Sequence, residues 1–295
     1  MSRGRRALLA LATFGAVAIV AFFVVELAPG DAASARLGLH GDDAARQALR
    51  EALGLSGGLV ERLGRWLAHL ARLDLGRSLL DGRPVAAKIA ERLPLTAALA
   101  AAALALAWAI ALPLALVRAR RARAGLTLAL GALYAVPVPA LGLALLALGG
   151  GYGPSAGALL AAAASLQPLL VPTVYAHLAR AIDEALHGDA LRTLRAAGAA
   201  PGRLRRAALR GQALRLLTLA ALQLPALLSG AALVEAIFGL PGIGLLAFDA
   251  LAGRDHPVQL GLVLTGAALA IGCNLAVDLV APLLDPRLQA RAGGR

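Results

Sequence analysis

The sequence has few of the residues that several protein classes require. Its one cysteine, Cys273, allows no internal disulfide and argues against a metal cluster built on thiolates. Its one lysine, Lys88, follows Ala87, so a phosphate-binding loop that ends in Gly-Lys-Ser/Thr cannot exist. Aromatic residues make up only 3%, and the charges lie between apolar runs, a pattern that argues against nucleic-acid binding despite 29 basic residues against 17 acidic ones. If the protein uses ATP, another chain binds it.

Charged residues as a group are also scarce, and apolar residues take their place. Of the 295 residues, 59% are hydrophobic and 16% are charged, and the mean hydropathy is +0.75. A soluble chain could not hide so much apolar surface and still cover itself with polar groups. A disordered chain is excluded for the same reason. The composition therefore predicts a membrane protein.

Long apolar runs with at most one charged residue predict six membrane-spanning helices, because a span needs about 20 apolar residues and must satisfy its own backbone groups. The first run follows arginines, as in a signal peptide, but residues 22–26 form a poor cleavage site, so we expect this run to be retained. Glycines and Pro154 divide the uncharged run 124–179 in two. The predicted spans are 7–25, 93–117, 126–148, 156–179, 216–238 and 256–284.

The arginines predict the orientation of these spans. They concentrate before the first span and in segments 118–123, 180–215 and 287–295, whereas the short loops on the other side have few. The positive-inside rule then places both termini in the cytoplasm. The predicted regions are the first span with its cytoplasmic N-terminus (1–28), an extracytoplasmic loop (29–92), a five-helix core (93–287) with a cytoplasmic loop (183–215), and a cytoplasmic tail (288–295).

The long extracytoplasmic loop is predicted to contain two short amphipathic helices. Apolar residues recur at helical spacing in 42–53 and again in 59–73, and Trp66 suits the membrane interface. These helices could pack only against the bundle, or one could contact an external partner.

The cytoplasmic loop between the fourth and fifth spans is longer than a turn requires. Residues 189–197 favour a helix with Asp189 at its N-terminus, Gly198 ends it, and Pro201-Gly202 turns the chain before a second basic helix at 203–210. The arginines could be topology determinants that contact anionic lipid headgroups. Alternatively, the short helix could be a rigid lever that docks into a cytoplasmic partner.

Several ordered motifs give the chain a family resemblance. Residues 192–198 read RTLRAAG where the B-type permeases of oligopeptide, dipeptide and nickel importers have RTARAKG, with Ala197 in place of the family's lysine and Arg215 in place of a downstream proline. Further matching stretches are 29–31, 74–78, 84–85, 92–96, 235–244, 254–257, Asn274, Asp278 and 285–287. The chain thus resembles the inner-membrane permease subunits of binding-protein-dependent ABC importers.

This resemblance implies an all-α membrane protein of six transmembrane helices, with the type I ABC importer permease topology, in a bacterial inner membrane. The implied partners are a second homologous permease, two ATP-binding subunits and an extracytoplasmic solute-binding protein, besides membrane lipid. The chain would hold no cofactor, and ATP and Mg would bind to the ATPase subunits. The cargo would be di- or oligopeptides, with nickel or another small solute as the alternative. The implied ATPase-coupling residues are Asp189, Arg192, Thr193, Arg195, Ala196, Ala197, Gly198 and Pro201.

A second set of residues is a candidate for the pathway or its gate. Glu235 is an ionisable residue in a predicted span and is followed by a glycine-rich stretch, so it could be a gate element or a structural carboxylate that caps backbone N–H groups. Asn274 and Asp278 share one helix face and could bond across helices. The candidates are Glu235, Phe238, Pro241, Gly242, Gly244, Asn274 and Asp278.

His177 and His256 are predicted near opposite membrane faces, so we expect no shared metal site.

Two other functions remain as alternatives to an ABC importer. An ion-coupled secondary transporter would show repeated halves and several ionisable groups at the midplane, and the sequence shows neither pattern. A membrane scaffold without transport activity is the other alternative.

Overall fold

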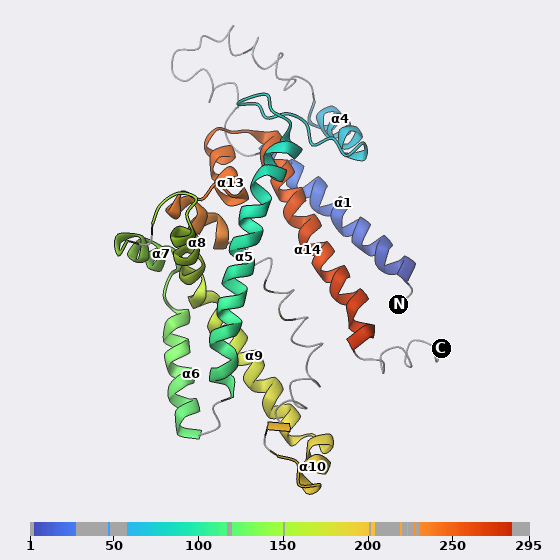
Figure 1. Cartoon of the computed structure of the whole chain (residues 1–295). Coiled ribbons are helices and arrows are strands. Elements are labelled where there is room, and N and C mark those ends of the chain that lie inside the picture. Colours follow the sequence, from blue (N-terminus) through green and yellow to red (C-terminus); the bar gives the residue numbers. More distant parts are fainter. Residues whose placement is uncertain are drawn as a thin grey trace. The chain divides into compact units, whose positions relative to one another are not determined.

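The computed structural model describes residues 3–27, 47, 58–116, 120–149, 151–200, 202–203, 219, 223, 227 and 230–284. Within these ranges the regular elements are helices, and the one β-type contact is an isolated antiparallel bridge between Arg77 and Pro84. The helices are labelled in Figure 1: α1 (Arg3–Leu27), α4 (Leu59–Ala71), α5 (Val85–Ala115), α6 (Arg120–Tyr134), α7 (Val138–Ala147), α8 (Ala156–Ser165), α9 (Gln167–His187), α10 (Asp189–Ala196), α13 (Ile243–Ala252) and α14 (His256–Leu284).

The helices confirm the predicted all-α membrane fold. Three of the described segments are long and apolar enough to cross a membrane: Leu8–Leu27, Val85–Ala115 and His256–Ala276. Three further pairs of helices pass the same test only when each pair is counted as one broken span, which gives up to six spans. The orientation of the termini stays a prediction.

The third predicted span, 126–148, is not a single straight helix. It consists of α6 and α7, which meet at an angle of 83°. Pro137 stands at the N-cap of α7 in an extended conformation, and Pro139 follows in the first turn. A proline offers no backbone N–H to the preceding turn and clashes with it, so α6 cannot continue through this point.

The fourth predicted span, 156–179, is also broken. Its two parts, α8 and α9, are bent by 56°. Ser155 caps α8 by accepting a hydrogen bond from the Ala158 N–H at 3.1 Å. Pro168 lies in the first turn of α9, where its missing N–H would have no intrahelical acceptor. This proline explains why a new helix begins here.

The second span begins earlier than uncharged residues alone predict. The helix α5 starts at Val85, eight residues before the predicted boundary at 93. The predicted boundary is late because the first two turns of α5 carry charged residues, and an uncharged run locates only the apolar part of a helix.

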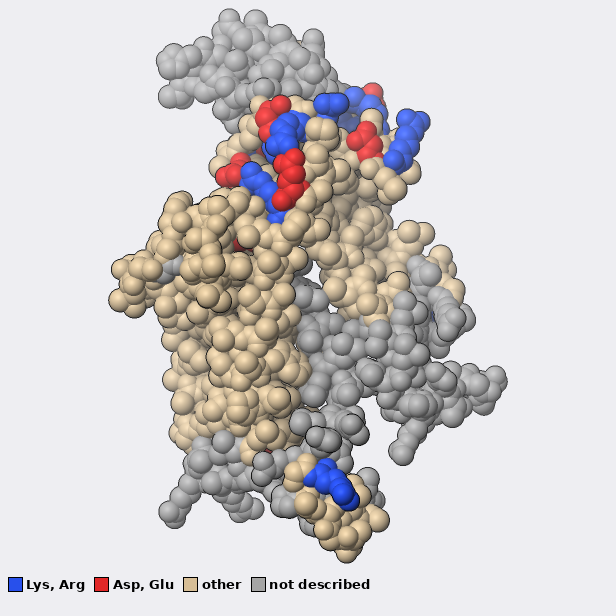
Figure 2. All heavy atoms as spheres, viewed as in Figure 1, with Lys and Arg blue, Asp and Glu red and all other residues tan. Residues whose placement is uncertain are grey.

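The chain divides into two compact units. The first unit comprises residues 1–96 and 241–271, and the second comprises residues 97–240 and 272–295. In the first unit, one buried cluster joins the start of α5 to α13 and α14 through Val85, Ile89, Leu246, Ala250 and Val258. Figure 2 shows the charged side chains of this unit gathered over α4 and the start of α5.

The amphipathic helix predicted at 59–73 is confirmed as α4, and it packs on its own chain. Leu59, Leu63 and Trp66 lie against a buried cluster that includes Phe22 of α1 and Leu260 of α14. The rings of Trp66 and Phe22 have centroids 5.4 Å apart. The helix predicted at 42–53 falls outside the described residues, apart from Gln47.

Alanines organise the second unit. In α5, Ala103, Ala107 and Ala111 recur every four residues on one face, and each is fully buried. In α8, Ala158 and Ala162 are buried to the same extent. Small residues at this spacing let helix backbones approach closely, which is how helices associate in a membrane. The alanine-rich runs therefore serve packing as well as insertion.

Candidate functional site

The predicted coupling segment contains the expected short helix, α10. Arg192, Thr193, Ala196 and Ala197 are exposed, and the helix is amphipathic. Figure 2 shows basic atoms on this segment. The side chains of Asp189 and Arg195, and the whole of Pro201, fall outside the described part of the chain, as does most of the predicted basic helix 203–210.

Gly198 ends this helix as the sequence predicts. Its φ of +76° lies in the left-handed region, and the Ala199 N–H donates to the Leu194 carbonyl at 3.0 Å, which closes the last turn. A Cβ atom built on Gly198 would meet nothing within 4 Å. The backbone conformation therefore requires the glycine, and no described residue crowds this position.

The predicted gate segment, residues 235–244, begins with two fully buried residues, Glu235 and Phe238. Glu235 takes part in a polar interaction, so it is not an isolated buried charge. Its backbone carbonyl accepts a hydrogen bond from the Leu240 N–H at 2.9 Å. Gly239 has a φ of +64°, and the Phe238 carbonyl accepts a hydrogen bond from the Gly153 N–H at 2.8 Å. The loop at 151–155 is thus bonded directly to the end of the helix Gly230–Phe238.

The rest of the gate segment leads into α13. Pro241 is exposed, and Gly242 is the N-cap of α13 in an extended conformation. The Ile243 N–H donates at 2.9 Å to the hydroxyl of Thr96, a buried residue of α5. Gly244 is buried in the first turn. The glycines therefore break the chain only as far as Gly242, and the following ten residues are helical.

The remaining pathway candidates lie on α14. Asn274 is exposed, and the side chain of Asp278 falls outside the described residues. Their predicted pairing across helices stays a prediction. In the described part of the chain, no group of three or more His, Cys, Asp or Glu residues could hold a metal ion. His177 and His256 belong to different units.

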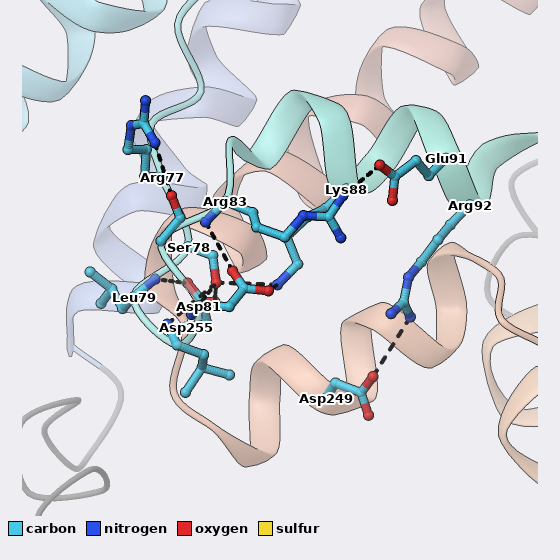
Figure 3. Close-up of polar contacts among 12 residues, drawn as sticks. Arg77, Ser78, Leu79, Asp81, Arg83, Lys88, Glu91, Arg92, Asp249 and Asp255 are labelled. Atoms are coloured by element: carbon cyan, nitrogen blue, oxygen red, sulfur yellow. Dashed lines mark hydrogen bonds and ion pairs between the residues drawn. The ribbon is translucent and has the colours of Figure 1, made fainter.

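A buried polar cluster in the first unit was not predicted from the sequence. It joins Ser78, Asp81, Lys88 and Asp255 and is called the Ser78 cluster below (Figure 3). The Ser78 hydroxyl donates to one oxygen of Asp255, and the Leu79 N–H donates to the other at 3.0 Å. The Lys88 ammonium donates to Ser78 Oγ at 3.2 Å and to Asp81 at 2.8 Å. The cluster fixes the turn before α5 to the turn before α14.

The electrostatics of the Ser78 cluster favour its charged form. The hydrogen bond from Lys88 is the largest cause that lowers the pKa of Asp81 to about 2, although burial alone would raise that pKa. Ser78, Lys88 and Asp255 are all buried. A buried ammonium is tolerated only when it is paired and hydrogen-bonded, as Lys88 is here.

Some signal for this cluster was present in the sequence. Lys88 is the one lysine in a chain whose other basic residues are arginines, and Ser78 and Asp255 lie in two of the motifs that carry the family resemblance. Neither motif shows by itself that the two stretches meet. A second ion pair, between Arg92 and Asp249 at 3.7 Å, joins α5 to α13 nearby (Figure 3).

Residues 103–290 match the family described as binding-protein-dependent transport system inner membrane component. A "Putative peptide transport system permease protein" of Brucella abortus is 32% identical over 294 residues, which cover 92% of this chain and 94% of the relative. The di/tripeptide transport system permease protein of Pseudomonas aeruginosa is 42% identical over 110 residues, which cover 37% of this chain and 33% of the relative. The family match contains α10 and the gate segment, whereas most of the Ser78 cluster lies before it.

Proposed function

Since this chain belongs to the family of binding-protein-dependent transport system inner membrane components, we propose that it is the permease subunit of an ABC importer that carries di- or oligopeptides. The relatives that cover most of the chain are named for peptide transport, which supports peptides as cargo. Specificity would be shared with the solute-binding protein that delivers the peptide.

The observation that carries the proposal is α10 and its left-handed glycine. A short exposed helix, held at one end by a span and ended by Gly198, can transmit a push without bending. Because the chain has no phosphate-binding loop, the push must come from other subunits. Two ATPase subunits that bind ATP and Mg would supply it, one through this chain and one through a second, homologous permease.

The mechanism that follows is alternating access. Closure of the ATPase subunits on ATP would move α10, reorient the spans and open them toward the docked binding protein. ATP can shift this equilibrium only because the closed ATPase pair has a different affinity for the two states of the permease. Hydrolysis would return the spans and release the peptide to the cytoplasm.

The test is purification of the intact complex followed by transport in proteoliposomes. We expect the tagged chain to recover an ATPase and a second permease, and we expect labelled peptide to enter only with the binding protein and ATP. Uptake that needs an ion gradient, collapses with an ionophore and ignores ATP would instead identify a secondary transporter. Recovery of neither partner and no uptake would leave the scaffold alternative.

A further inference from the structure

The second unit contains a groove of about 630 Å³ between α6 and α9. One wall is α6 and the other is α9, and the two helices contact each other. The described lining residues are Thr127, Leu130, Gly131, Tyr134, Pro172, Thr173, Tyr175, Ala176, His177, Ala179, Arg180 and Asp183. Each wall belongs to a pair of helices that is apolar enough to form a broken span.

The chemistry of this groove is unusual for such apolar helices. It gathers hydroxyl groups on α6 and an imidazole, a guanidinium and a carboxylate on α9. Arg180 and Asp183 directly follow the predicted span 156–179 and begin the arginine-rich segment 180–215, so these side chains lie at the predicted cytoplasmic end of the groove. Asp183 already takes part in a polar interaction, so it is not assigned a role. Arg180 is exposed, and no hydrogen bond or ion pair of its guanidinium is found in the described part of the chain.

His177 presents a hydrogen-bond acceptor one helical turn before Arg180. Its Nδ1 lies 2.8 Å from the Thr173 carbonyl oxygen. A carbonyl can only accept a hydrogen bond, so Nδ1 carries the proton, and in the neutral ring Nε2 keeps a lone pair. Residues three apart on a helix are neighbours on one face, about 5–6 Å apart at their Cβ atoms. The groove therefore offers a cation and an acceptor side by side.

We propose that this groove holds the peptide during its passage, and that Arg180 binds the terminal carboxylate of the peptide. This inference rests on the proposed peptide function. A guanidinium forms two parallel hydrogen bonds with a carboxylate, a geometry that lysine cannot reproduce. His177 Nε2 accepts from the last backbone N–H of the peptide, which lies within one extended residue, about 3.3–3.6 Å, of that carboxylate. The exposed setting keeps binding weak enough for release.

The experiment compares two cargoes in the complete importer reconstituted with its binding protein: a dipeptide with a free carboxylate and the same dipeptide with a C-terminal amide. The readout is the uptake rate of the free carboxylate divided by the uptake rate of the amide. The ratio of each variant is then divided by the wild-type ratio, which cancels differences in protein amount and in delivery. Because an exposed ion pair contributes little, we expect R180Q to lower this ratio roughly fivefold. R180K keeps the charge but cannot form the two parallel hydrogen bonds, so its ratio should lie between those of R180Q and the wild type.

Two further variants are controls. Arg72 is an exposed arginine at the C-cap of α4, so R72Q removes the same charge outside the groove and should leave the ratio unchanged. H177A should slow both cargoes by a similar factor, since each keeps its last backbone N–H. A dipeptide that carries a photoreactive group should label α6 or α9 during turnover in the wild-type complex.

The outcomes separate this inference from the proposed function. If the wild type imports both cargoes and R180Q has the wild-type ratio, or slows both equally, the assignment of Arg180 is overturned and the peptide function stands. If the wild type imports neither cargo with ATP and the binding protein, the proposed function fails and this inference fails with it. Labelling of other helices alone would overturn the groove as the path.

Discussion

The hydroxyl of Ser78 donates a hydrogen bond to the carboxylate of Asp255, although 177 positions separate the two residues. Both are buried, and the second carboxylate oxygen accepts the Leu79 N–H at 3.0 Å. Each oxygen of Asp255 therefore has a donor from the turn before α5. The Ser78 cluster thus links this turn to the residues that lead into α14.

Replacement of Ser78 by alanine should weaken the first unit. One buried oxygen of Asp255 would lose its donor, and a hydrogen bond to a charged group contributes about 1.5–3 kcal/mol. We expect a lower midpoint of thermal unfolding for S78A in nanodiscs. The control is R83Q, which removes the ion pair of Arg83 with Glu91, whose side chains are 51% and 56% exposed, and should cost at most about 1 kcal/mol. Equal shifts for the two variants would contradict this role of Ser78.

The ion pair between Lys88 and Asp81 predicts how this stability depends on pH. The folded pKa of Asp81 is about 2, below its ordinary value of 3.8, so the pair contributes stability above pH 4 and loses it as the pH falls toward 2. Asp81 is 42% exposed, so the effect is modest. The difference in unfolding midpoint between wild type and K88M should stay constant from pH 8 to about 5 and shrink below about 4. A difference that changes between pH 6 and 8 would point to another group.

The sequence predicted the helices well and their breaks less well. Uncharged runs located α1 and α14, because the length of a span is set by the membrane and by backbone hydrogen bonding. Pro137 and Pro139 explain why α6 ends before α7, but the angle of 83° depends on what the two helices pack against. The break before α9 was not predicted, although Pro168 lies there, because the alanine-rich run favours one continuous helix.

The candidate sites also divide into those that a local sequence pattern predicts and those that it does not. The helix α10 and the turn at Gly198 follow from local propensity and were predicted. The Ser78 cluster and the bond from Ile243 to Thr96 join residues far apart in the sequence. No local pattern reveals such partners, because the free energy of a buried polar group depends on what the rest of the fold places beside it.

Gly239 and Tyr152 predict a non-additive pair of substitutions. A Cβ atom on Gly239 would lie 2.7 Å from Tyr152 Cε1 and 2.8 Å from its hydroxyl oxygen, and the φ of +64° adds a conformational cost of about 1–2 kcal/mol. G239A should therefore be destabilised by more than the backbone cost alone. In the Y152A background only the backbone cost should remain, as measured by unfolding of all four proteins. Additive effects would mean that the Tyr152 ring moves aside freely.

Gly198 allows the lever role of α10 to be tested with graded substitutions. Asparagine tolerates the left-handed conformation better than other residues with a side chain, so G198N should keep most uptake. G198A should cost about 1–2 kcal/mol locally and lower the uptake per ATP hydrolysed. Leucine has similar backbone strain, and a Cβ atom meets nothing within 4 Å among the described residues. A further loss in G198L would therefore come from atoms that the longer side chain reaches, and the lever role predicts that these belong to a partner subunit.

The measurement is peptide uptake and ATP hydrolysis in the same proteoliposomes, with the amount of inserted protein as the control. We expect G198L to insert normally and to hydrolyse ATP, but to import little peptide, because a distorted end of α10 would no longer move with the ATPase subunits. G198L and G198A with equal uptake would show that no partner surface lies against this position. Normal uptake by G198L would overturn the lever role itself, since neither the conformation nor the contact at Gly198 would then be needed for coupling.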